Sequence, residues 1–104
     1  MSESPYILEG EFTLWPGEIR TYNMNWPEFD AVSSGVSAAY VAGSTVGILT
    51  GSEVEAGNIH TMRTITIPAD YGGNTVIVTS QVDVGTERFI KGIVIRVLQP
   101  GETP

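Results

Sequence analysis

The sequence predicts an all-β protein, an antiparallel β-sandwich of about seven strands, and three observations support this class. Apolar and polar residues alternate at a period of two in several short segments, which is the pattern of strands with one buried side. Gly, Pro, Asn and Asp separate these segments at short intervals. No stretch keeps the apolar period of a helix, so we expect no helix beyond a single turn. A small β-barrel is the alternative architecture.

The strongest strand signal is TVIVTSQVDVGTERFIKGIVIRVL, residues 75–98, which predicts the last hairpin of the fold. One side of its first arm is apolar except for Ser80, and Gly85-Thr86 offers a two-residue reversal. In the second arm Ile90 is out of phase with the apolar residues of 93–97. We therefore expect a β-bulge at Lys91-Gly92 that brings Ile90 onto their face. The apolar side of the first arm consists of Val76, Val78, Val82 and Val84.

Shorter strands precede this hairpin. Residues 6–14 form the first, in which Gly10 marks a bulge or a crossing between sheets, and Trp-Pro-Gly-Glu at 15–18 is a turn. Residues 19–26 alternate until Pro27 ends the strand, because proline cannot donate to the ladder. The residues expected to be buried here are Tyr22, Met24 and Trp26 in the strand and Phe29 and Val32 in the connection after it.

The middle of the chain predicts two further strands, residues 36–43 and 45–50, with Tyr40 as the anchor of the first. Residues 51–58 are acidic and bracketed by glycines, which indicates a loop or a weak edge strand around Val54.

Residues 59–67 alternate again, and Arg63 breaks their apolar phase, which places that end of the strand at the rim of the sandwich. Tyr71 lies in dense turn punctuation before the final hairpin. A tyrosine at this corner hydrogen-bonds back to the backbone in immunoglobulin-like domains, so the sandwich is expected to be immunoglobulin-like. The alternation places Ile59, Ile65 and Ile67 on one side and His60, Met62, Thr64 and Thr66 on the other.

The chain of 104 residues predicts a single domain, 1–104, with a polar arm at 1–5 and a polar tail at 99–104. The net charge of −7 and the isoelectric point near 4.4 argue against nucleic acid and anionic membranes as partners. The absence of cysteine excludes a disulfide scaffold, a cysteine-zinc site and thiol catalysis. We expect a soluble protein without an export signal, since no segment is apolar enough to span a membrane.

The residues offer little catalytic chemistry. A Ser-His-Asp hydrolase needs a nucleophile and an acid within reach of its histidine, and we expect the single histidine, His60, to be exposed and structural. Glu53 and Glu55, with Asp30 or Asp70, have the ligand type for calcium but not the spacing of a calcium loop, so they predict a solvated acidic loop. We expect no enzyme activity, no cofactor and no metal.

Two features are candidates for partner binding. Trp15 lies in a turn, where it either forms an exposed anchor or folds back to cap the sandwich. Residues 1–8 either add as a strand to a neighbour's sheet or form a frayed terminus. Aromatic residues also allow a sugar-stacking platform, although Tyr22 and Trp26 share the phase of the core. The predicted partner-binding residues are Tyr6, Ile7, Leu8 and Trp15. The platform would consist of Trp15, Trp26, Tyr6, Tyr22 and Tyr40.

A family resemblance rests on four features: the turn at 15–18, the alternating strand after it, the small residues 33–35 followed by Tyr40, and the closing strand ERFIK that runs into IVIRV. Over about residues 10–98 the chain resembles small immunoglobulin-like accessory proteins of tailed bacteriophage virions.

The resemblance implies a non-enzymatic structural protein of a virion, assembled in the host cytoplasm. It would be a capsid decoration or cement protein that binds the major capsid protein or other virion subunits, with self-association as a further possibility, or a small module of the tail. It implies no catalytic residues, no nucleic-acid partner and no membrane partner. A carbohydrate-binding or adhesion module is the alternative function.

Overall fold

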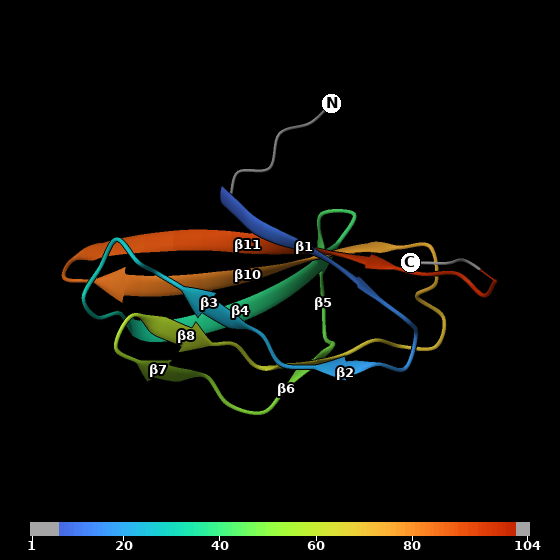
Figure 1. Cartoon of the computed structure of the whole chain (residues 1–104), viewed down its shortest axis with the longest axis horizontal. Helices are drawn as coiled ribbons and strands as arrows, with labels where there is room; N and C mark the ends of the chain where they lie inside the picture. The colour runs from blue at the N-terminus through green and yellow to red at the C-terminus, as the bar shows by residue number, and fades with distance from the viewer. Residues whose placement is uncertain (1–6, 102–104) are drawn as a thin grey trace.

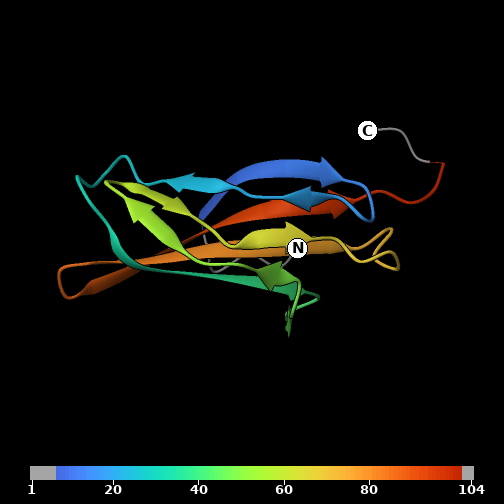
Figure 2. The same cartoon turned by 90° about the horizontal axis from the view of Figure 1, so that it is seen from below.

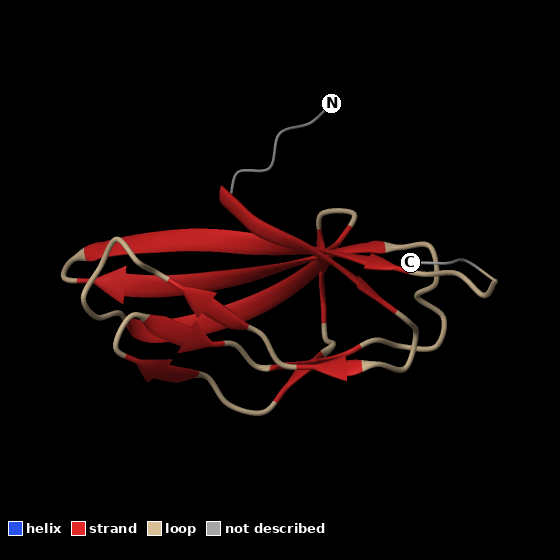
Figure 3. Ribbon diagram, viewed as in Figure 1, coloured by secondary structure: helices blue, strands red, loops and turns tan. Residues whose placement is uncertain are grey.

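The computed structural model describes residues 7–101, with side chains from residue 10 onward, and all its regular elements are strands (Figure 1, Figure 3). The predicted all-β class is confirmed. None of the described residues belongs to a helix that could cross a membrane. The strands are β1 (Ile7–Leu14), β2 (Ile19–Arg20), β3 (Asn23–Asn25), β4 (Ser33–Val41), β5 (Ser44–Val46), β6 (Leu49–Thr50), β7 (Val54–Ala56), β8 (Ile59–Thr61), β9 (Thr64–Thr66), β10 (Thr75–Val84) and β11 (Glu87–Val97).

These strands form a sandwich of two layers. One layer is a five-stranded sheet in the order β1-β11-β10-β4-β5. The other consists of two three-stranded sheets, β2-β9-β6 and β3-β8-β7, which lie end to end along the first (Figure 1, Figure 2). Short breaks at residues 21–22, 51–53 and 62–63 separate the strands of these two sheets. The predicted β-sandwich is therefore confirmed, and the barrel alternative is wrong.

The first strand departs from the expected antiparallel arrangement, because β1 pairs parallel with β11. Its register shifts between Leu8 and Gly10, so the bulge predicted at Gly10 is confirmed. The predicted turn at 15–18 is also present: the Glu18 N–H donates to the Trp15 carbonyl at 3.1 Å, and Gly17 takes a φ of 88° that favours glycine. This turn carries the chain from β1 into the second layer.

The predicted hairpin is present, with Gly85-Thr86 between β10 and β11 and Gly85 at a φ of 62°. The bulge predicted at Lys91-Gly92 is wrong, because the β10–β11 register runs without interruption. Ile90 stays on the face that points away from the second layer, and Lys91 takes the inward position opposite Ser80. A buried lysine fills this inward position because it has partners there, which are described below.

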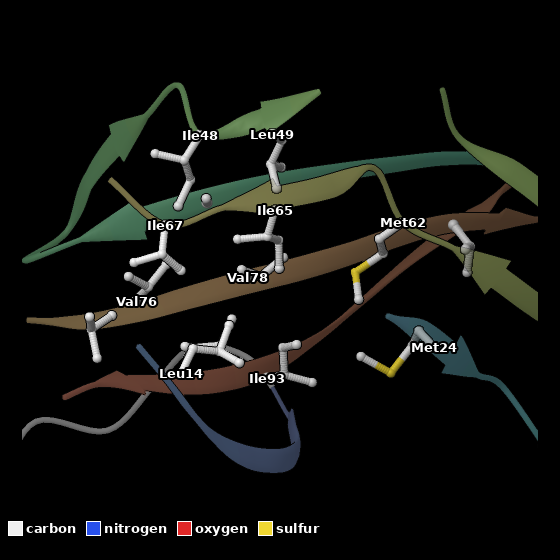
Figure 4. Packing of buried hydrophobic residues seen from close by; sticks show 14 of the residues in the cluster. Leu14, Met24, Ile48, Leu49, Met62, Ile65, Ile67, Val76, Val78 and Ile93 are labelled. Atoms are coloured by element: carbon white, nitrogen blue, oxygen red, sulfur yellow. The ribbon is translucent and has the colours of Figure 1, made fainter. Parts of the chain in front are cut away.

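The core lies between the two layers, and its apolar side chains come from every part of the chain (Figure 4). The predicted inward residues of 19–32 are confirmed: Met24, Trp26 and Val32 are buried, and Tyr22 and Phe29 pack against the core as partly buried residues. The remaining fully enclosed residues include Leu14, Ala39, Met62, Ile65, Ile67, Val76, Val78, Val82, Ile93, Ile95 and Val97.

The phase predicted for residues 59–67 is wrong in its first half. His60 and Met62 point inward together with Ile65, because the break at residues 62–63 shifts the alternation by one residue between β8 and β9. Tyr40 is not the anchor of β4 either. It pairs with Ile77 on the face that points away from the second layer, and its neighbour Ala39 takes the inward position.

The edge strand expected around Val54 is confirmed as β7, which pairs with β8 alone. Tyr71 packs against the core at the expected corner. The hydrogen bonds found for it among the described residues come from its backbone, with its N–H donating to Pro68 and its carbonyl accepting from Asn74. The tyrosine-corner bond expected of its hydroxyl is therefore not part of the described structure.

Candidate functional site

A chain of hydrogen bonds between polar side chains crosses the core. The Trp26 indole Nε1–H donates to Ser80 Oγ at 3.3 Å, and Ser80 Oγ lies 2.6 Å from His60 Nδ1. On the other side of the ring, His60 Nε2 lies 2.9 Å from Glu53 Oε1. Since a carboxylate only accepts, Nε2 carries the proton, and Nδ1 accepts from the Ser80 hydroxyl. We call Trp26, Ser80, His60 and Glu53 the buried relay.

Glu53 connects the buried relay to a third strand, β4. Its carboxylate accepts the Ser37 backbone N–H at 2.7 Å and the Ser37 hydroxyl at 2.8 Å. It also pairs with Arg63, whose Nε lies 3.3 Å from Glu53 Oε2 and whose Nη2 donates to the Ser37 carbonyl. Arg63 is partly exposed, as predicted for a residue at the rim. The buried relay therefore ties β4 and β10 of the large sheet to β8 and the segment before β7.

A second polar contact lies beside the Trp26 ring. Lys91 Nζ is 4.5 Å from the ring centroid, 3.0 Å from Glu28 Oε1 and 3.4 Å from the Asn25 carbonyl. A buried ammonium group is tolerated only when charges or dipoles compensate its lost hydration. These three partners explain why Lys91, and not Ile90, occupies the inward position.

The buried relay has the residue types of a hydrolase triad but not its accessibility. The side chains of His60 and Ser80 are both 0% exposed. The prediction that His60 is exposed is therefore wrong, and the reason is the shift of phase between β8 and β9. A nucleophilic serine must meet its substrate, and here the Ser80 hydroxyl faces the Trp26 indole. The arrangement orders the core and offers no surface to a substrate.

Glu53 also departs from the sequence prediction of a solvated acidic loop, whereas Glu55 is exposed as expected. Burial alone would raise the pKa of the Glu53 carboxyl. Hydrogen bonds from the Ser37 backbone and hydroxyl and from His60 outweigh burial, so the pKa is lowered. Among the described residues, no group of three or more His, Asp or Glu side chains is placed to hold a metal ion.

We predict a pH-dependent effect of Glu53→Gln. Because the folded pKa lies below its ordinary value near 4.5, the Glu53 carboxylate stabilises the fold above that pH, and the contribution is lost as the pH falls through the folded pKa. Urea unfolding should show the variant less stable than wild type at pH 7, with the difference shrinking below pH 4.5. Glu55→Gln, a change at the neighbouring exposed acid, should stay within about 0.5 kcal/mol of wild type. A difference that does not change between pH 7 and pH 3 would contradict the assignment.

The face of the large sheet that points away from the second layer is uncharged in its centre. Across β4, β10 and β11 the registers place Val36 beside Gln81 and Ile90, Ala38 beside Thr79 and Gly92, and Tyr40 beside Ile77 and Val94. None of these positions is charged, although the chain carries a net charge of −7. Val36 is 48% exposed and Ile90 is 37% exposed. We call these nine residues the outer face.

The predicted partner-binding residues lie in different places. Trp15 is 37% exposed in its turn, which is intermediate between the anchor and the cap considered above. Ile7 and Leu8 are in β1, where their backbone pairs with Lys91 and Gly92 of β11. These two residues therefore already belong to the chain's own sheet. Tyr6 lies outside the described residues. None of the four belongs to the outer face. Sequence reasoning missed the outer face, although alternation along β10 and β11 could have indicated it.

The layers, the strand order and the closing hairpin define an immunoglobulin-like β-sandwich. The fold is similar to that in a crystal structure of the Titin M10-Obscurin like 1 Ig complex, with a TM-score of 0.52 and 15% sequence identity over 92% of this chain and 93% of that chain. At this identity the similarity shows the fold alone. No protein-family model matches the chain, and no curated protein matches it.

Proposed function

We propose that this protein is a non-enzymatic binding module that contacts other proteins through its outer face, and that it serves as an accessory protein of a phage virion. The outer face is the observation that carries the proposal. An uncharged, partly exposed sheet face on a strongly acidic protein is the surface expected of a protein interface. The buried relay supports the non-enzymatic part, because its serine and histidine are both 0% exposed.

The virion role rests on the sequence resemblance and on the paired strands of the large sheet, which present a preformed surface. A decoration protein binds the assembled shell in many copies and not the dissociated subunits, so it shifts the equilibrium toward assembly. This requires a preformed surface and no chemistry. The outer face lies on the longest strands of the fold, β4, β10 and β11, which are joined by continuous ladders over most of their length.

Co-sedimentation tests this function with purified capsids and tails of the phage whose genome encodes the chain. Wild-type protein should pellet with the capsids, and Val36→Glu and Ile90→Glu should weaken binding at least about tenfold, because each would bury a carboxylate in the interface. Val54→Glu is the matched control, since Val54 is 52% exposed on β7 in the other layer. Absence of pelleting, or equal weakening by Val54→Glu, would refute the proposal.

The carbohydrate-binding alternative has less support. Of the aromatic residues considered for a stacking platform, Trp26 is buried and Tyr40 lies on the outer face, so they do not form one row. One small pocket does combine aromatic and amide side chains, among them Tyr22 and Asn23. Its volume of about 180 Å³ is below the roughly 300–1,000 Å³ typical of small-molecule sites.

A further inference from the structure

The strand β3 has one paired edge and one unpaired edge. Within the described residues it pairs only with β8, and it ends the order β3-β8-β7. The Trp26 N–H donates to the Asn58 carbonyl and the Met62 N–H donates to the Tyr22 carbonyl. In an antiparallel ladder these bonds place the backbone groups of the even-numbered residues toward β8. The N–H and C=O groups of Asn23 and Asn25 therefore point away from β8.

These outward groups are almost entirely without partners in the described structure. The Asn25 carbonyl accepts a long hydrogen bond of 3.4 Å from Lys91 Nζ. The outward N–H groups of Asn23 and Asn25 and the Asn23 carbonyl have no partner among the described residues. An unpaired row of this kind is a template for another strand, and β3 has neither a bulge nor a lysine of its own to block it. We call these outward groups the Asn23/Asn25 edge.

A small pocket lies along this edge, between the two layers. It has a volume of about 180 Å³ and is lined by Phe12, Tyr22, Asn23, Met24, Asn25 and Ile93. Phe12 of β1 and Tyr22 meet across the gap with ring centroids 4.6 Å apart. β1 belongs to the other layer, where it is hydrogen-bonded to β11 and not to β2 or β3. The pocket has room for one apolar side chain of a strand that pairs with the Asn23/Asn25 edge.

Charge indicates what kind of segment fits. Both cations beside the edge are already neutralised, Arg20 by Glu18 at 3.0 Å and Lys91 by Glu28 at 3.0 Å. The chain as a whole is acidic, with a net charge of −7. A segment with basic residues is therefore favoured over an acidic one.

We propose that the Asn23/Asn25 edge binds an extended, basic segment of a partner protein by strand addition, with one of its apolar side chains in the pocket. Main-chain hydrogen bonds would hold the segment, and the pocket would select its register. The proposal rests on the protein-binding role proposed above but uses a different surface from the outer face. The two can therefore fail independently.

Amide hydrogen exchange measured by NMR on the full chain tests the proposal. The probe is the synthetic peptide Lys-Val-Thr-Leu-Thr-Val-Lys, and its control is the same peptide N-methylated at the interior amides, which removes the donors. With the first peptide in excess, exchange at Asn23 and Asn25 should slow at least about tenfold, while Met24 and Trp26, whose N–H groups point toward β8, should change little. The methylated peptide should have no effect.

A variant supplies the second test. Asn25→Pro removes one outward N–H and keeps the carbonyl, so it should weaken peptide binding about tenfold while circular dichroism stays that of a folded β-protein. Thr66→Ala, an exposed change on β9, is the control that should bind like wild type.

Several outcomes would overturn the proposal. Unchanged exchange at Asn23 and Asn25, or equal protection by the methylated peptide, would exclude strand addition. Titration with chitotetraose that shifts the Phe12 and Tyr22 signals without protecting the two amides would assign the pocket to a sugar. If capsid binding fails while the peptide still protects the edge, the virion role is wrong and the edge assignment holds.

Discussion

Trp26→Ala is expected to lower the free energy of unfolding by about 4 kcal/mol and the melting temperature by about 20 °C. The side chain is only 2% exposed, and it takes part in both polar clusters of the core. It donates to Ser80, packs against Phe29 with ring centroids 6.3 Å apart, and lies beneath the Lys91 ammonium. Its loss would leave a cavity, and both the Ser80 hydroxyl and the buried Lys91 charge would have one partner fewer.

The chain offers a matched control, because its other tryptophan lies in an exposed turn. Trp15→Ala removes the same number of atoms and should cost about 1 kcal/mol. Trp26→Phe should fall between the two, since it keeps most of the ring packing but loses the Nε1–H bond to Ser80. Thermal and urea unfolding of the three variants give the order. Equal effects of Trp15→Ala and Trp26→Ala would show that Trp26 does not organise the core.

Trp26 organises the core of a domain that has no disulfide. Antibody-type immunoglobulin domains join their two sheets by a disulfide beside a buried tryptophan, and this chain has no cysteine. Here the buried relay connects the layers by hydrogen bonds, which run from Trp26 beside β3 through Ser80 of β10 to His60 of β8. The stability then depends on the burial and pairing of these polar groups, because an unpaired one is costly in the interior.

The sequence predicted what depends on neighbours along the chain. The alternation of β10 placed Val76, Val78 and Val82 on the buried side, together with the polar Ser80, and the structure confirms all four. The reversal at Gly85-Thr86 followed from turn chemistry alone. In a strand, the side of each residue follows from the positions next to it, so an uninterrupted strand is legible from its own residues.

The errors concern residues whose position depends on distant partners. The expected bulge would put Ile90 inside and Lys91 outside. The structure keeps the alternation unbroken, and Lys91 is tolerated inside because Glu28, Asn25 and Trp26 stabilise the ammonium. His60 was misplaced because a break of two residues shifted the phase of its strand. The partners of Lys91 lie more than 60 positions away in the chain, and no local pattern connects them. The Asn23/Asn25 edge was hidden for the same reason, since a strand does not show which of its sides is paired.

The contact between Gly35 and His60 gives the second large effect. Gly35 is buried on β4, and a Cβ added there would lie 2.5 Å from His60 Cδ2 and 2.6 Å from His60 Nε2. The imidazole cannot retreat without breaking its bonds to Ser80 and Glu53. We therefore expect Gly35→Ala to lower the free energy of unfolding by about 3 kcal/mol. His60→Ala should cost a similar amount, about 3 kcal/mol, because it leaves a cavity and removes the acceptor of the Ser80 O–H.

The double variant distinguishes this contact from a general weakness of the fold. Once His60 is alanine, a methyl group at Gly35 no longer meets a ring and fills part of the cavity. Its remaining close neighbour is Glu55 Oε2 at 3.0 Å, the end of an exposed side chain that can move. Gly35→Ala should then cost less than about 1 kcal/mol in the His60→Ala background, so the two effects fall short of their sum by about 2 kcal/mol or more. Urea unfolding of the wild type, both single variants and the double variant measures this difference. Additive effects would mean that the imidazole does not occupy the space beside Gly35, and the buried relay would have to be reassigned.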